Sequence, residues 1–326
     1  MPRRAWLALF GAATGVVLLI LTWIASFHIG VVGRADASVL QGFADLEGPF
    51  VNWLAAAIAD LCDPKPFVFL AGAVVLVALI RRRGRVAVAV AAILLGANVT
   101  TQLLKTLLTG THPVAYTLAG QLSYKSAAWP SGHATAAMSL ALCAVLVAPA
   151  RFRPMVAALG AAFAVSVCFS FLILAWHYPS DVLGGFLVAT TWTLVGVAAV
   201  WLADARFPRR GSRRPAVRLT ARQALGPPVA AALGACALVG LVVIARPQAV
   251  VTYAHAHKAF VIGAAAIGAL GLALATGLML ATTMRRGGDD PVGVTGGDGT
   301  VSVTTGDELE SAPALSARVS AGEVQR

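Results

Sequence analysis

The chain has 326 residues, of which 58% are hydrophobic and only 12% are charged. Soluble globular proteins carry about 25% charged residues, so this composition excludes an ordinary soluble enzyme, and its hydrophobicity excludes disorder over most of the length. The formal net charge of +11 does not indicate a nucleic-acid partner, because the basic residues form short clusters between apolar runs rather than one patch. That pattern is typical of a protein that crosses a membrane several times.

Eight apolar stretches approach the length needed to cross a bilayer core about 30 Å thick, which is roughly 20 residues per helix. In chain order they cover residues 5–27, 66–80, 86–108, 134–148, 155–176, 182–202, 229–245 and 259–284. The second and fourth are short, and we expect them to extend into their flanks. The first resembles a signal peptide in its basic start, but its apolar run exceeds the usual 7–15 residues, which favours an uncleaved helix.

Basic clusters lie in the connections between these stretches. They are Arg3 and Arg4, Arg81 to Arg85, Arg151 and Arg153, the Arg-rich stretch from Arg206 to Arg222, and Arg285 and Arg286. If the spans alternate, every cluster falls on one side, and the positive-inside rule makes that side cytoplasmic. We therefore expect a multi-pass protein of the cell membrane with both termini in the cytoplasm. The stretch from Arg206 to Arg222 is expected to contact anionic lipid on that face.

The sequence predicts an all-α, polytopic membrane helix bundle of about eight transmembrane helices. Residues 39–62 are only moderately apolar and predict an interfacial or re-entrant helix on the outer surface. The last residues are rich in Gly, Asp, Thr and Ser, which is typical of disorder. The predicted parts are a first transmembrane helix and outer loop (1–38), a membrane core (39–202), a basic cytoplasmic linker (203–228), a two-helix C-terminal extension (229–284) and a disordered cytoplasmic tail (285–326).

The four cysteines, Cys62, Cys143, Cys168 and Cys236, lie in or beside apolar segments without the spacing of a metal site. We read them as small buried hydrophobic residues and predict neither a disulfide framework nor a bound metal or cofactor.

Ionisable residues at the ends of apolar helices are costly to place and mark candidate functional sites. Three groups fall at the outer ends of the spans: Lys105 followed by His112, then Pro130-Ser131-Gly132-His133, and then His177 with Asp181. Each alone has a simpler explanation. A lysine can extend to the head groups, Pro-Ser-Gly can begin a helix, and an aspartate can cap one. Together they contain the parts of one reaction.

That reaction is phosphoryl transfer through a phosphohistidine. A neutral imidazole attacks phosphorus, and a carboxylate on its other nitrogen fixes the tautomer and stabilises the cation that forms. A second imidazole protonates the leaving oxygen. The N–H groups of Gly132 and His133 at a helix start, the Ser131 hydroxyl and the Lys105 ammonium bind the phosphate oxygens. The scheme requires no metal.

The three groups resemble the signature of the phosphatidic acid phosphatase type 2 / haloperoxidase superfamily, which is Lys-x6-Arg-Pro, Pro-Ser-Gly-His and Ser-Arg-x5-His-x3-Asp. Lys105 reaches His112-Pro113 at the first spacing, Pro130 to His133 match the second block in full, and Ser170-Phe171 precede His177 and Asp181 at the third. The resemblance covers residues 39–202. It implies a six-helix phosphatase-like core with His177 as nucleophile, Asp181 as its partner and His133 as general acid. It further implies phosphate binding by Lys105, Ser131, Gly132 and, at the arginine position, His112.

Both arginines of the signature are replaced, by His112 and Phe171, and neither side chain reproduces a bidentate guanidinium. Another basic residue can substitute; the candidates are Lys125, His255, His257 and Lys258. Two interpretations remain. One is an active, metal-independent membrane lipid phosphatase that hydrolyses a lipid phosphomonoester or diphosphate, or transfers the phosphoryl group to an alcohol, at the outer face. The other is a degenerate member that binds phospholipid or serves as a membrane partner. Transport has no support beyond the number of spans.

Overall fold

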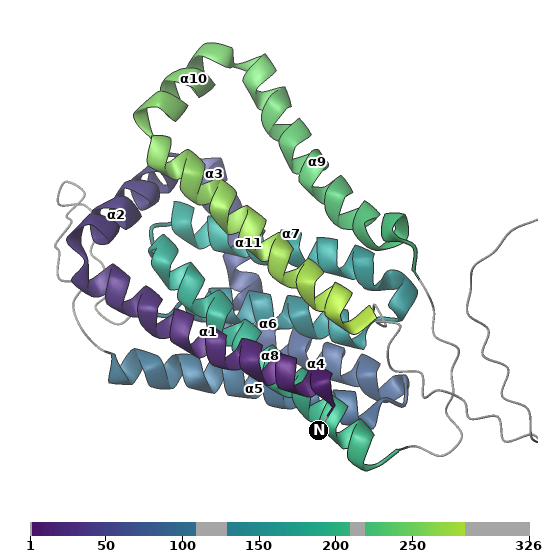
Figure 1. Ribbon diagram of the computed structural model, residues 1–326. Coiled ribbons are helices and arrows are strands. Elements are labelled where there is room, and N and C mark those ends of the chain that lie inside the picture. The colour runs from purple at the N-terminus through teal and green to yellow at the C-terminus, as the bar shows by residue number, and fades with distance from the viewer. Residues whose placement is uncertain (1, 109–128, 209–218, 284–326) are drawn as a thin grey trace, which may run out of the picture. The chain divides into compact units, whose positions relative to one another are not determined.

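A computed structural model describes residues 2–108, 129–208 and 219–283, and within these ranges the chain is helical and has no strand. The helices are α1 (Arg3–His28), α2 (Gly30–Ala44), α3 (Pro49–Ala59), η1 (Asp60–Cys62), α4 (Pro64–Ile80), α5 (Gly84–Leu107), α6 (Gly132–Val147), η2 (Ala150–Phe152), α7 (Arg153–Ile173), α8 (Pro179–Arg206), α9 (Ala221–Ala245), α10 (Pro247–Ala256) and α11 (Lys258–Thr283) (Figure 1). The predicted all-α class is confirmed.

Six of these helices are long and apolar enough to cross a membrane: α1, α5, α7 with η2, α8, α9 and α11. A seventh span forms if α3 and α4, which are bent by 53° at η1, count as one. The protein is therefore a multi-pass membrane protein. All eight predicted stretches fall on helices, but α6 has only 16 residues and does not reach the length of a span. It does not extend as expected, because Ser131 caps its start and Pro149 follows its end.

The helices differ from three of the predicted parts. The expected outer loop before residue 39 is helical, and the boundary falls inside α2, whose buried residues recur at helical spacing (Gly33, Asp36, Ala37, Leu40). The linker predicted over 203–228 is partly helical, since α8 continues to Arg206 and α9 begins at Ala221 and includes Pro227 and Pro228. The two-helix extension contains a third, short helix, α10. The predicted disordered tail lies outside the described residues.

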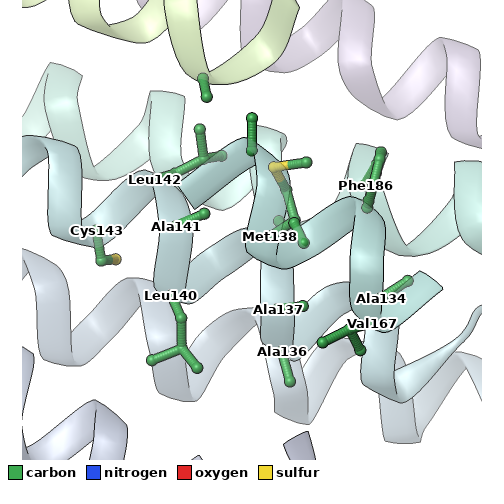
Figure 2. Packing of buried hydrophobic residues seen from close by; sticks show 14 of the residues in the cluster. Ala134, Ala136, Ala137, Met138, Leu140, Ala141, Leu142, Cys143, Val167 and Phe186 are labelled. Carbon is green, nitrogen blue, oxygen red and sulfur yellow. The ribbon is translucent and has the colours of Figure 1, made fainter. Parts of the chain in front are cut away.

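The centre of the bundle is α6, which packs against α4, α5, α7, α8 and α11. Thirteen of its residues are buried, on every side of the helix. Its alanines alternate with larger residues such as Met138 and Leu142, and Val167 of α7 and Phe186 of α8 pack beside them (Figure 2). A helix that is apolar all round is stable only inside such a bundle. The short α6 therefore fixes its first residues against its neighbours.

Two glycines allow α8 to approach the start of α6. A Cβ on Gly185 would lie 2.7 Å from the Cβ of Ala134 and 2.8 Å from the carbonyl oxygen of Ser131. A Cβ on Gly184 would lie 2.9 Å from the Cβ of Pro130. Small residues at helix contacts permit this close packing in membranes.

The basic clusters within the described residues meet at one end of the bundle. Arg83, between α4 and α5, donates to the carbonyl oxygen of Leu146 at the end of α6 (2.8 Å). Arg153 at the start of α7 donates to the carbonyl oxygen of Thr282 at the end of α11 (2.7 Å), and Arg85 pairs with Asp204 near the end of α8 (2.6 Å).

Helix α1 runs antiparallel to α8, because Gly11 faces Leu194 and Gly15 faces Thr191 (Figure 1). This pairing places the basic start of α1 beside the basic end of α8. The candidate residues lie at the opposite helix ends, namely the end of α5, the start of α6 and the turn between α7 and α8.

The close contact at Gly185 makes a direct prediction. Replacing Gly185 with alanine forces the helices apart, and we expect it to destabilise the purified protein by about 1–3 kcal/mol, as overpacking does. Thermal unfolding in detergent measures the loss. Gly234→Ala on α9 is the matched control, because a Cβ there meets nothing within 4 Å. Equal melting temperatures for the two variants would contradict the packing argument.

Candidate active site

The turn between α7 and α8 carries His177. Helix α7 ends with Ala175 in the left-handed region at a φ of 53°, and two backbone bonds close the end: Ala175 N–H to the oxygen of Leu172 (3.0 Å) and Trp176 N–H to the oxygen of Phe171 (2.9 Å). This is the Schellman arrangement, with alanine where glycine is usual. It reverses the chain within a few residues, so His177 directly precedes α8.

Asp181 fixes the ring of His177. It is the third residue of α8 and fully buried, and its carboxylate reaches back as acidic residues do in the first turn of a helix. The same oxygen, Oδ2, lies 2.9 Å from the Tyr178 N–H and 3.1 Å from Nδ1 of His177. Nδ1 therefore faces the carboxylate, which leaves Nε2 as the nitrogen directed away from it.

The Pro130–His133 segment begins α6. Ser131 is the N-cap, and its Oγ accepts a hydrogen bond from the Ala134 N–H at 3.3 Å. Its own N–H donates to the carbonyl oxygen of Asp181 at 3.0 Å, which joins this segment to the start of α8. Gly132 and His133 are then the first two helical residues, whose N–H groups have no partner inside the helix.

The two histidines lie side by side, with 6.4 Å between their ring centroids. Phe171 is fully buried and contacts both rings, at 5.2 Å from His177 and 6.0 Å from His133. Trp176 also contacts His133, with 5.9 Å between the ring centroids, and is 44% exposed. One phosphate group can contact both imidazoles at this separation, and Phe171 adds an apolar wall where the family signature has arginine.

Lys105 approaches the same place from α5. Its Nζ lies 3.5 Å from the position that a Cβ on Gly132 would occupy, and the side-chain nitrogen of Gln102, one turn earlier, lies 3.8 Å from it. The ammonium also interacts electrostatically with Asp181 and His133. The start of α6 thus lies next to two side-chain donors.

The structure brings six of the seven predicted site residues together: His133, His177, Asp181, Lys105, Ser131 and Gly132. The seventh, His112, lies outside the described residues, as does the possible substitute Lys125. His257 is not at the site, because its Nε2 pairs with Asp45 of α2 at 2.8 Å. Helix α10, which carries His255, packs against α9 and α11.

Two carboxylates at the site were missed by sequence reasoning. Asp63, between η1 and α4, lies 3.0 Å from Nε2 of His133. Asp36 on α2 accepts hydrogen bonds from the N–H and Oγ of Ser180, at 2.9 and 2.6 Å. Both come from segments far from the family signature in sequence. In the described part of the chain, no group of three or more His, Cys, Asp or Glu side chains is arranged to hold a metal.

Residues 86–205 match the model of the PAP2 superfamily, which confirms the resemblance for the segment that carries Lys105, the Pro130–His133 segment, His177 and Asp181. Among solved structures, the chain is similar to a transmembrane PAP2-type phosphatidylglycerolphosphate phosphatase from Bacillus subtilis, with 20% identity and a TM-score of 0.49. That similarity covers 62% of this chain and 99% of the other. No curated protein sequence matches the chain at a significant level.

The buried carboxyl group of Asp36 predicts how the stability of the protein depends on pH. Burial raises the pKa of Asp36 to about 7, against the effect of the Ser180 hydrogen bonds, which lower it. The unfolded carboxyl loses its proton near pH 4, while the folded one holds it to about pH 7. The stability that this group contributes is therefore complete below about pH 4 and is lost as the pH rises to about 7.

We expect the melting temperature of the wild-type protein to fall between about pH 4 and pH 7, and that of Asp36→Asn to fall less. Thermal unfolding at a series of pH values measures both. Asp60→Asn, at an exposed position of η1, serves as the control and should keep the wild-type dependence. If the melting temperatures of Asp36→Asn and the wild type depend on pH in the same way, the raised pKa of Asp36 is contradicted.

Proposed function

On the premise that residues 86–205 belong to the PAP2 superfamily, we propose that the protein is a membrane lipid phosphatase. Its substrate is a lipid phosphomonoester or diphosphate, and the reaction passes through a phosphohistidine. His177 is the nucleophile, Asp181 its partner and His133 the general acid. Lys105, Ser131, Gly132 and His112 bind the phosphate.

The observation that carries this proposal is the pair of imidazoles at the start of α6. Their ring centroids are 6.4 Å apart, Nδ1 of His177 faces Asp181 at 3.1 Å, and both rings adjoin the N-terminus of a buried helix. A helix N-terminus favours anions through its unpaired N–H groups and its dipole. The arrangement supports attack by one imidazole on a phosphorus atom held by the other groups.

The proposed reaction has two steps. Nε2 of His177 forms a bond to phosphorus while the bond from phosphorus to the lipid oxygen breaks, and the leaving oxygen takes a proton from His133. Asp181 stabilises the charge that develops on the His177 ring. In the second step His133 accepts a proton from water, the water oxygen attacks phosphorus, and inorganic phosphate leaves with His177 restored. An acceptor alcohol in place of water would give phosphotransfer.

The position of the residues supports a lipid substrate. They lie at the ends of α5 and α7 and the starts of α6 and α8, where we expect lipid head groups to meet the apolar part of the bilayer. The arginine clusters lie at the opposite ends of these helices. By the positive-inside rule, the site faces the outside and both termini face the cytoplasm.

One observation favours a second candidate function. Phe171 is fully buried against both histidines and supplies no charge to a phosphate. Loss of a donor that stabilises a transition state costs about 10²–10³ in rate. A member whose site has degenerated in this way would bind phospholipid or serve as a membrane partner without turning it over.

Phosphate release distinguishes the two functions. We expect the purified protein to release phosphate from at least one of phosphatidic acid, phosphatidylglycerol phosphate and a polyprenyl diphosphate in mixed micelles. His177→Ala should abolish release, and His133→Ala should reduce kcat by about 10²–10⁴. EDTA should leave the rate unchanged, because the proposed steps use no metal. His255→Ala is the matched control, since this histidine is exposed on α10.

No release from any of these lipids, with lipid binding undiminished in His177→Ala, would favour the degenerate member instead. Release that persists in His177→Ala would contradict the phosphohistidine.

Phe171 provides an independent test. If the rate is limited by the lost arginine, Phe171→Arg should raise kcat/KM by about 10-fold or more, because a guanidinium at this position adds charge-assisted hydrogen bonds to the phosphate. Phe171→Leu removes the ring without adding charge and should give no gain. A folded Phe171→Arg protein, judged by its melting temperature, with unchanged or lower kcat/KM would show that the arginine is not what limits the rate.

A further inference from the structure

The side chain of Asp63 has an unusual hydrogen-bond partner for an N-cap residue. The residue is the N-cap of α4, the position from which an aspartate usually accepts a bond from the second or third N–H of its helix. It makes no such side-chain bond. Its Oδ1 instead lies 3.0 Å from Nε2 of His133, a residue 70 positions later in the chain.

The local sequence explains why the carboxylate turns away from α4. Pro64 and Pro66 occupy the first and third positions of the helix, and proline has no N–H to donate. Of the two usual capping donors, only the N–H of Lys65 is left. The Asp-Pro-Lys-Pro sequence therefore begins a helix and leaves its N-cap carboxylate available for another group.

The bend between α3 and α4 places the Asp63 carboxylate at the candidate site. Helices α3 and α4 meet at 53° around η1, and both η1 and α4 pack against α6. Asp63 therefore faces the first turn of α6, where His133 lies. It also lies outside residues 86–205, the segment that matches the PAP2 superfamily.

We propose that Asp63 is a positioning residue for His133, so that the bent α3–α4 segment completes the active site. The inference rests on the proposed function of His133 as general acid. With Nε2 held by the carboxylate, Nδ1 is the nitrogen directed at the leaving oxygen. The carboxylate also stabilises the protonated ring, which is the form that a general acid needs.

Solvent moderates the effect of the Asp63 charge on the His133 ring. The side chain of Asp63 is 48% exposed, and solvent screens an ion pair at such a site. Three groups face the His133 ring from the packed elements: Asp63 itself, His177 from the turn before α8 and Lys105 from α5. Two of these are basic, so Asp63 is the one carboxylate among them that favours the protonated ring.

The first test does not depend on activity. In protein labelled with ¹⁵N-histidine in detergent micelles, the ring signals of His133 are assigned by their loss in His133→Asn. We expect these signals to titrate at lower pH in Asp63→Ala and Asp63→Asn than in the wild type. Asp60→Asn is the matched control, because it removes the same charge three residues earlier at an exposed position.

The second test is kinetic. With the lipid phosphate that the wild type hydrolyses, Asp63→Ala should lower kcat by about 10-fold or more, but by less than the loss in His133→Ala, with little change in KM. The alkaline limb of the pH–rate profile should move to lower pH. Asp63→Asn retains an acceptor oxygen and should lose less rate than Asp63→Ala, and Asp63→Glu should recover part of it.

The outcomes separate this inference from the function it rests on. Unchanged His133 titration in both Asp63 variants would overturn it, whatever the activity. So would a wild-type kcat and pH profile in Asp63→Ala when His133→Ala is impaired. If the wild type releases no phosphate from any lipid, the proposed function fails, while the titration still decides whether Asp63 controls the His133 ring.

Discussion

The candidate site depends on one buried carboxylate. Asp181 is fully buried, and a charge in such a place is tolerated only if it is paired and hydrogen-bonded. Its Oδ2 contacts both Nδ1 of His177 and the Tyr178 N–H, and its backbone oxygen accepts the Ser131 N–H. One residue therefore stabilises the first turn of α8, orients one imidazole and connects that imidazole to the segment that carries the other. Losing the carboxylate would release the His177 ring and the Tyr178 N–H, while the backbone bond to Ser131 does not depend on it.

Close packing of α8 against α6 holds the residues of this network in place. In a membrane, helices gain little from hydrophobic burial against one another, so contact depends on how closely the backbones approach. Gly184 and Gly185 bring α8 against the start of α6, and α6 is enclosed by five other helices. The first turn of α6 therefore has little freedom to move relative to His177. A short central helix suits this role, because both of its ends are held by neighbouring helices.

Local patterns were predictable and distant partners were not. The four-residue spacing of His177 and Asp181, the Pro-Ser-Gly start of α6 and the apolar runs all lie within short windows, so sequence alone indicated them. Asp63 and Asp36 contact residues 70 and 144 positions away. Asp63 directly followed the segment (39–62) that we expected to be interfacial, and Asp36 fell in an expected loop. The unused N-cap in Asp-Pro-Lys-Pro was the signal for Asp63, and the spacing of Gly33, Asp36 and Leu40 was the signal for α2.

The charges at the site indicate a second role for its histidines, which is to supply positive charge. Among the described residues, the Lys105 ammonium interacts with Asp181 and His133, Asp63 lies beside His133, and Phe171 stands where the family signature has arginine. An arginine stays charged at every physiological pH, whereas imidazole changes its charge near neutrality. In the proposed reaction, with fewer permanent cations, compensation of the bound phosphate falls on the dipole of α6, on Lys105 and on protonated His133. A carboxylate beside His133 then serves two needs at once, because it favours both the proton that the leaving group takes and the positive charge that holds the phosphate.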